Sequence, residues 1–457
     1  MLRGEQYCPR GVRLALHASV ESIIRMNQNL YDFAVVFFVL AIVGFALPFT
    51  TNYPGTANTF GPSSYIMAGG QTGTWFGPNQ FARLETITLS NYSVTSLTPV
   101  STQGTVWAGG WNGSQWLISG WGIDLPSPNG SDPYIFLYNG RNQVLGPSLD
   151  QYEGETTWHG GDIFAASSDG ADWLLSGLGS GNLPSYGNSN HMSLALFNGT
   201  NFIDLSRMLP IQTDYILYAN AWNGRYWLIG GGYGASGVLF SFDGSKIADL
   251  TAKLSRVIPK FGSVQSIAWN GQSWLIGGVN FLAAYDGHLF IDLTAALDTA
   301  LEQNDGRCNS VNAIAWDGVG WVLGGGPPIA QRGLSHAWLV RYASGTFTNL
   351  TSKFSSTENE LMPDESVLSI AATKGEWIIG GYLNGQRLLT EYDGFSFKNL
   401  SYLVSNYTYV NWVGVHLFPE IVTRLDRQNL SSTESPIPLL SERLIDETNW
   451  PRLVLAL

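Results

Sequence analysis

Residues 266–278 read SIAWNGQSWLIGG, and the same arrangement returns at 219–232 as ANAWNGRYWLIGGG and at 313–326 as AIAWDGVGWVLGGG. Each stretch holds two short apolar runs separated by Asn-Gly or Asp-Gly, a pair that favours the positive φ angles of a type I′ hairpin turn. More divergent copies stand at 109–120, 166–177 and 369–382. The pattern predicts one β-hairpin per copy.

A second hairpin is predicted directly after each first one. The clearest copies are LAAYDGHLFIDLT at 282–294, VLFSFDGSKIADLT at 238–251 and LLTEYDGFSFKNLS at 388–401. Less regular copies stand at 135–146, 194–206 and 339–351. Two hairpins give four antiparallel strands, and a repeat of roughly 45 to 57 residues is the size of one β-propeller blade.

Seven aromatic residues occupy one repeat position, at the start of the second strand: Tyr65, Trp116, Trp173, Trp227, Trp274, Trp321 and Trp377. We therefore predict an all-β, seven-bladed β-propeller of four-stranded antiparallel blades over residues 55–416. These aromatics are expected to be packing residues, as are the recurring Trp111, Trp222, Trp269 and Trp316. The first copy lacks a leading strand, and YVNWVGVHL at 409–417 is expected to supply it and close the ring.

The double glycine after each WLI strand, followed by a late aromatic pair such as Tyr285 and Phe290, resembles kelch-type propellers of the galactose-oxidase-like class. The resemblance covers about residues 60 to 404 and implies the fold. A copper centre of that class needs a Tyr–Cys crosslink and paired His ligands. The only cysteine after the hydrophobic segment is Cys308, and no histidines are paired at ligand spacing, so no metal and no cofactor is predicted.

The segment Phe33–Phe49, FAVVFFVLAIVGFALPF, carries no charge. Its length of about 26 Å as a helix is close to the hydrocarbon thickness of a bilayer. Several arginines precede it, and basic residues favour the cytoplasmic side. We predict a cytoplasmic stub at 1–32, one N-terminal transmembrane helix at 33–51 as a signal anchor, and a propeller outside the cytoplasm at the cell membrane. A cleaved signal peptide, or a start at Met26, are the alternatives.

Residues 417–457 leave the repeat pattern and contain four prolines, so this tail is predicted to be a loosely packed appendage. The formal net charge is −12 and only 13% of residues are charged. Nucleic-acid binding depends on clustered Lys and Arg, so no nucleic acid is expected as a partner. The two cysteines, Cys8 and Cys308, lie on opposite sides of the predicted membrane helix and are not expected to pair.

The connections from second to third strand vary in length and emerge on one face of a propeller, which we take as the candidate binding face. The long connections are expected at 120–133, 177–192, 230–237 and 324–337. They contain the candidate ligand-binding residues Trp121, Tyr186, Asn188, His191, Tyr233, Arg332 and His336. Such loops suit stacking on sugar rings or anchoring a protein partner. The alternative is that they only cap the ring.

Eight Asn-x-Ser/Thr sequons follow the membrane segment, at Asn91, Asn112, Asn129, Asn198, Asn349, Asn399, Asn406 and Asn429. They are glycosylation candidates if the host attaches glycans. Several also fall in turns or in the Asp position of the repeat. The leading hypothesis is a membrane-anchored binding module for a protein or carbohydrate ligand, without catalytic residues. A surface hydrolase or lyase, and a structural envelope component, are the alternatives.

Overall fold

The computed structural model describes fourteen ranges within residues 65–416. These are 65–72, 81–89, 91–97, 104–122, 132–141, 143–145, 161–180, 190–211, 213–301, 310–326, 337–355, 365–372, 376–383 and 386–416. The predicted stub, the predicted membrane helix 33–51 and the tail lie outside them. In the part that is described, no helix is long and apolar enough to span a bilayer.

The described chain forms seven antiparallel sheets of four strands each. Blade 1 consists of β28 (Tyr409–His416), β1 (Tyr65–Thr72), β2 (Phe81–Thr88) and β3 (Val94–Ser96). Blade 2 consists of β4 (Gly104–Trp111), β5 (Trp116–Gly122), β6 (Asp132–Tyr138) and β7 (Gln143–Leu145). Blade 3 consists of β8 (Gly161–Ser168), β9 (Trp173–Ser180), β10 (Asn190–Phe197) and β11 (Phe202–Asp204). Blade 4 consists of β12 (Ile216–Trp222), β13 (Trp227–Tyr233), β14 (Ser236–Phe242) and β15 (Ile247–Asp249).

The remaining blades follow the same order from the centre outward. Blade 5 consists of β16 (Val264–Trp269), β17 (Trp274–Gly278), β18 (Phe281–Tyr285) and β19 (Phe290–Asp292). Blade 6 consists of β20 (Ser310–Trp316), β21 (Trp321–Gly326), β22 (Trp338–Ala343) and β23 (Thr346–Asn349). Blade 7 consists of β24 (Ser366–Ala372), β25 (Trp377–Leu383), β26 (Gln386–Tyr392) and β27 (Phe397–Asn399). The predicted seven-bladed, four-stranded architecture is confirmed.

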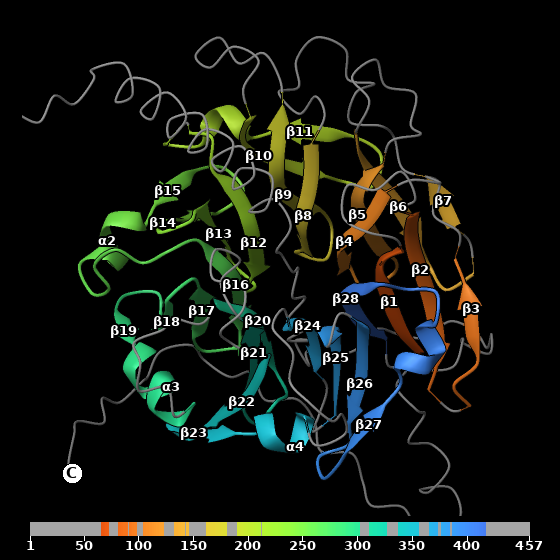
Figure 1. Cartoon of the computed structure of the whole chain (residues 1–457). Coiled ribbons are helices and arrows are strands. Elements are labelled where there is room, and N and C mark those ends of the chain that lie inside the picture. Colours follow the sequence, from red (N-terminus) through yellow and green to blue (C-terminus); the bar gives the residue numbers. More distant parts are fainter. Residues whose placement is uncertain are drawn as a thin grey trace, which may run out of the picture. The chain divides into compact units, whose positions relative to one another are not determined.

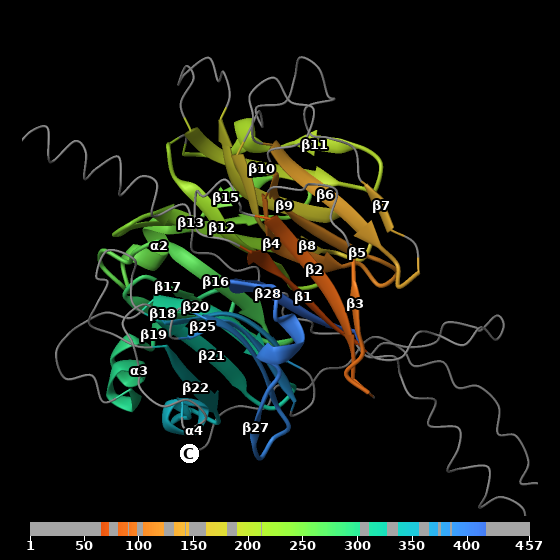
Figure 2. The ribbon, with the colours of Figure 1, turned by 45° about the vertical axis from the view of Figure 1, so that its right-hand side comes forward.

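The two ends of the described chain meet in blade 1. β28 pairs antiparallel with β1, from Tyr65 opposite His416 to Gln71 opposite Tyr409, and the blue β28 lies beside the orange β1 in Figures 1 and 2. The innermost strands contact one another in a closed series: β4, β8, β12, β16, β20, β24, β28 and again β4. The predicted closure of the ring by the last strand is therefore confirmed.

The seven aromatics at the start of the second strands are core residues, all no more than 5% exposed. In blades 2, 4, 5 and 6 each packs on the tryptophan opposite it, with ring centroids 4.1 to 5.5 Å apart. Tryptophan pairs of this kind contribute packing beyond the area they bury. Their predicted role in packing is confirmed.

The double glycine of the repeat is required by two close approaches. A Cβ on Gly230 would lie 2.3 Å from Cγ1 of Val264 in the next blade, and a Cβ on Gly231 would lie 2.0 Å from the carbonyl oxygen of Ile216 within its own blade. The first contact recurs at Gly69–Val106, Gly277–Val311, Gly324–Val367 and Gly380–Val410. The glycines are thus part of the sheet packing, because only a residue without a Cβ lets the blades approach this closely.

The turn of the first hairpin differs from the predicted two-residue type I′ turn. In blade 2, Asn112 Oδ1 accepts the backbone N–H groups of Ser114 and Gln115 at 3.0 and 2.9 Å. Only Gly113 has a positive φ, +96°, whereas type I′ needs two such residues. The turn is held instead by the hydrogen bonds that the Asn or Asp side chain accepts from the backbone, so a second residue with positive φ is not needed. Residues 344–345 of blade 6 have positive φ at both positions, +51° and +77°.

A second motif, Asp/Asn-Leu-Thr/Ser, begins with the last residue of the fourth strand in blades 3 to 7. In blade 4, Asp249 Oδ1 accepts the N–H of Thr251 at 2.8 Å, and the Thr251 hydroxyl accepts the N–H of Leu239 at 3.0 Å. A short helical segment follows: η2 (Ser206–Met208), α2 (Thr251–Ser255), α3 (Thr294–Ala300), α4 (Thr351–Ser355) and η4 (Ser401–Val404). The motif therefore fixes the end of the outer strand to the third strand of the same blade.

Candidate functional site

Each innermost strand carries one β-bulge, so that one residue per blade has no partner on the second strand. By register these residues, called the bulge ring below, are Trp107, Phe164, Tyr218, Gln265, Asn312, Leu368 and Asn411. None is more than 6% exposed. A bulge redirects the side chain of its extra residue. In this propeller the redirected side chain stands at the same position of the innermost strand in every blade.

Members of the bulge ring connect neighbouring blades. The ring centroids of Trp107 and Phe164, and of Phe164 and Tyr218, lie 5.7 Å apart. Asn312 Nδ2 donates to Ser366 Oγ at 2.8 Å, and Asn411 Nδ2 donates to the carbonyl oxygen of Val106 at 3.4 Å. Blades 2 to 4 thus supply an aromatic arc and blades 5, 6 and 1 an amide arc. Their burial makes them packing residues of the ring.

A buried carboxyl group lies beside the aromatic arc. Asp162 in β8 is 7% exposed, and burial raises the pKa of its carboxyl to about 7 against the opposing effect of a hydrogen bond with Trp107. Perturbed groups of this kind are enriched at functional sites. Across the described ranges, no three His, Cys, Asp or Glu side chains are placed to hold a metal ion together.

Three predicted ligand-binding residues fall within the described chain. Trp121 and Tyr233 are half-buried at the ends of the second strands β5 and β13. His191 was expected in a connection, but this prediction is wrong: it lies within β10 opposite Gly179 and is 1% exposed, because pairing extends to the ends of β9 and β10. The expected long connection at 230–237 is also wrong, since Tyr233 pairs with Ser236 across a two-residue turn.

The other four predicted ligand-binding residues, Tyr186, Asn188, Arg332 and His336, lie outside the described residues. So do the sequons at Asn129 and Asn429. The described sequon asparagines are exposed, except for the half-buried Asn112. Five of them accept the backbone N–H of the sequon Ser or Thr through Oδ1: Asn91, Asn112, Asn198, Asn349 and Asn399. The turns alone therefore account for these residues, and glycosylation stays a prediction.

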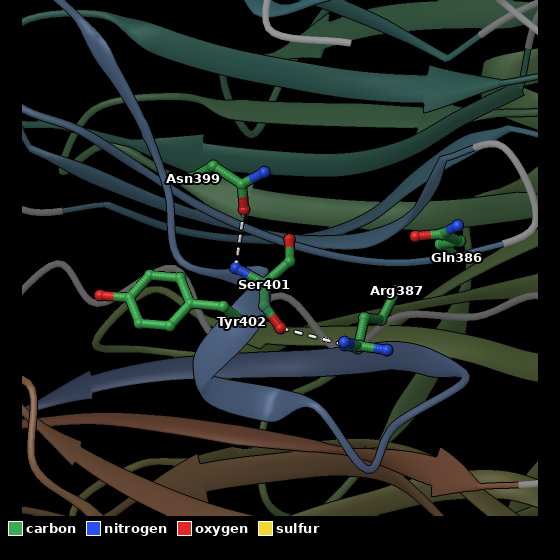
Figure 3. Close-up of a pocket in the computed structure, with 5 residues that line it drawn as sticks. All are labelled: Gln386, Arg387, Asn399, Ser401 and Tyr402. Atoms are coloured by element: carbon green, nitrogen blue, oxygen red, sulfur yellow. Dashed lines mark hydrogen bonds between the residues drawn. The ribbon is translucent and has the colours of Figure 1, made fainter.

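One pocket lies on blade 7, on the predicted binding face, where β26 begins and β27 ends. It has a volume of about 400 Å³ and is lined by Gln386, Arg387, Asn399, Ser401 and Tyr402. Pockets of about 300 to 1,000 Å³ are typical of small-molecule sites. Figure 3 shows Gln386 and the Tyr402 ring extending to opposite sides of Ser401, with Arg387 between Ser401 and Gln386. The pocket therefore has two chemically different ends.

The guanidinium of Arg387 is held in place by main-chain oxygens. Its Nε donates to the carbonyl oxygen of Ser401 at 3.0 Å, and Nη1 donates to the carbonyl oxygen of Tyr407 at 3.5 Å. Within the described part of the chain, the ion pairs are Arg341–Asp317 and Lys398–Glu391, and Arg387 takes part in neither. The pocket thus combines a positively charged group, two amides and Tyr402, which is 63% exposed.

Two of these residues depart from the repeat at their positions. Arg387 stands two residues before the leucine that pairs with the first glycine of the double glycine. The equivalent residues of blades 1 to 6 are Ala82, Pro133, Met192, Gly237, Asn280 and Ala337. Tyr402 replaces Arg207, Ala252, Ala295 and Ser352 of blades 3 to 6. Neither residue is among the candidates predicted from the sequence, although Arg387 is the only charged residue at its position in the seven repeats.

A smaller pocket of about 250 Å³ lies between blades 5 and 6 at the opposite ends of the strands. Its walls include Trp274, Trp316 and Trp321. These tryptophans belong to the packing set of the repeat, so this pocket follows from stacking of the blades. We therefore take the blade 7 pocket as the candidate site.

No protein-family model and no curated protein sequence matches the chain. Solved structures with a related arrangement include the β-propeller domain of the Trilobed protease from Pyrococcus furiosus, with 12% identity over 65% of this chain and 84% of that chain and a TM-score of 0.38. Acylaminoacyl peptidase from Pyrococcus horikoshii gives 9% identity over 74% of this chain and 52% of that chain, with a TM-score of 0.41.

YCF48 bound to D1 peptide gives 11% identity over 73% of this chain and 90% of that chain, with a TM-score of 0.40. The chain spans about half the length of the acylaminoacyl peptidase. Similarities at this level carry no functional argument. The fold assignment rests on the sheet topology of the chain itself.

Proposed function

We propose that this protein is a binding module that recognises a carbohydrate through the blade 7 pocket. The observation that carries the proposal is the set of groups in that pocket: a guanidinium held by main-chain oxygens, two side-chain amides and an exposed tyrosine. A sugar ring presents hydroxyl groups at its edge, which amides and Arg can bind, and an apolar face that an aromatic ring can cover. A protein ligand is the alternative.

The setting of this site is proposed from the sequence. The uncharged segment 33–51 and the arginines before it support a single membrane anchor with the propeller outside the cytoplasm. The finer assignment to the kelch-type, galactose-oxidase-like class is supported by the repeat pattern alone. Carbohydrate binding by a surface propeller, through a pocket on the predicted binding face, is the function that accounts for these features together. The fold itself does not decide the function, because propellers serve unrelated activities.

A glycan array probed with the detergent-purified full-length chain tests the proposal. Tyr402→Ala should weaken binding about tenfold, as expected for a central aromatic contact, and its exposure makes the substitution compatible with folding. Phe395→Ala is the matched control, because Phe395 is an aromatic residue 92% exposed in the turn of the same blade. Unchanged binding by Tyr402→Ala, or equal loss in both variants, would refute the blade 7 site. Capture of peptides but no glycan would favour the protein-binding alternative.

A further inference from the structure

We infer that the blade 7 pocket selects a carboxylated sugar, whose carboxylate is bound by Arg387. This inference rests on the proposed function and specifies its ligand.

Five of the described residues line the pocket: one arginine, two amides, one serine and one tyrosine. None of these five carries a negative charge at neutral pH. Arg387 is half-buried and forms no ion pair with the described residues. A partly buried cation without a counter-ion is costly, and an anionic ligand would remove that cost. The pocket is therefore a local cationic site in a chain of formal net charge −12.

The guanidinium of Arg387 is fixed in its plane, because Nε and Nη1 donate to the carbonyl oxygens of Ser401 and Tyr407. An arginine has five N–H donors, so donors on its terminal nitrogens remain for a ligand. Paired donors in one plane match the two oxygens of a carboxylate. A phosphate at neutral pH carries close to two negative charges and would call for a second cation, which the lining residues do not offer.

The Tyr402 ring and the Arg387 guanidinium lie on opposite sides of Ser401 in Figure 3. The aromatic contact and the charge contact are therefore made by different parts of one ligand. Asn399 lies above Ser401 and holds its N–H through Oδ1 at 2.8 Å. A disaccharide or longer chain with an acidic residue at one end suits this arrangement better than an acidic amino-acid side chain, which has no broad apolar face for Tyr402.

Isothermal titration with matched sugars tests the inference. The full-length chain would come from a host that attaches no N-linked glycans, because Asn399 is itself in a sequon. The probes are a disaccharide containing one uronic acid and its carboxyl-reduced, neutral counterpart. We expect the acidic sugar to bind about tenfold or more tightly, since a charge-assisted pair adds at least that ratio. Arg387→Gln should abolish this preference, and Arg387→Lys should retain part of it.

Arg225→Gln is the matched control, because Arg225 is an exposed arginine in a turn of blade 4 and its loss changes the net charge equally. Equal binding of both sugars, with Tyr402→Ala still weakening both, would overturn the inference and leave the proposed function standing. Binding of neither sugar would overturn the inference, and the proposed function would fall with it only if the glycan array also retained no glycan. Tighter binding of an aspartate-containing peptide, lost in Arg387→Gln, would overturn the sugar and retain the anion site. The comparison of sugars on the unaltered chain needs no variant to fold.

Discussion

Asp162 should make the stability of the folded chain fall as the pH rises through neutrality. Burial raises its carboxyl pKa from 3.8 to about 7, so the folded state keeps a proton that the unfolded state loses near pH 4. The contribution of this group to stability is complete below about pH 4 and is lost as the pH rises to about 7. The gap of about three pH units corresponds to roughly 4 kcal/mol, at about 1.4 kcal/mol per unit.

Asp162→Asn tests this reasoning, because the asparagine has the size of the neutral acid and cannot ionise. Near pH 4.5, above the ordinary carboxyl pKa of 3.8, the variant should be more stable than the unaltered chain by only about 1 kcal/mol. By pH 8 the variant should be more stable, by up to roughly 4 kcal/mol. Urea titrations followed by tryptophan fluorescence, from pH 4.5 to 8.5, measure the difference.

Asp243→Asn is the control with the opposite sign. The backbone N–H of Lys246 and then that of Ser245 lower the pKa of the exposed Asp243 carboxyl, so its contribution is present at neutral pH and is lost on acidification. A stability difference between Asp162→Asn and the unaltered chain that stays constant from pH 4.5 to 8.5 would refute the argument. It would mean that Asp162 ionises in the folded state at its ordinary pKa.

Three further outcomes are expected. Gly277→Ala should destabilise the chain by about 1 to 3 kcal/mol in urea unfolding, because the new Cβ would lie 2.5 Å from Cγ1 of Val311; Val311→Ala should cost less in that background than alone, and additive losses would contradict the contact. Asn349→Asp should abolish any glycan at this site, as measured by mass spectrometry. It should lower the free energy of unfolding by no more than about 1 kcal/mol, because aspartate ends the fourth strand of blades 4 and 5 and only the hydrogen bond from Nδ2 to the carbonyl oxygen of Ala300 is lost. A membrane-impermeant maleimide should label Cys308 but not Cys8 on intact cells and both after denaturing lysis; labelling of Cys8 on intact cells would reverse the predicted topology.

The repeat made the fold predictable, because each copy independently indicates the same hairpins. Even the incomplete first copy was informative: the absent leading strand before Tyr65 and the surplus strand at 409–417 imply one another. The ends of individual strands were less predictable than the number of strands. His191 was assigned to a connection because polar residues surround it in the sequence, whereas its burial depends on how far β9 and β10 continue to pair.

The candidate site was predictable only as a face. The blade 7 pocket joins the start of one strand, the end of another and the short helix η4, and no contiguous stretch of sequence brings these together. Arg387 could have been found by comparing equivalent positions across the repeat, since the other blades place Ala, Pro, Met, Gly or Asn there. The bulge ring could not have been found in this way, because its residues are the extra residues of the bulges, and only the strand pairing shows which residues these are.

Closure of blade 1 by β28 has a consequence for synthesis of the chain on the ribosome. Tyr65 of β1 can pair with His416 of β28 only after His416 has left the ribosome. The inner edge of β1 therefore stays unpaired while the other six blades are synthesised. Contacts so distant in sequence slow folding, and an unpaired strand edge can recruit another chain. A premature stop before residue 409 would therefore yield a chain with six complete blades and an unpaired edge on β1. We expect this product to aggregate rather than to persist as a protein that binds its ligand more weakly.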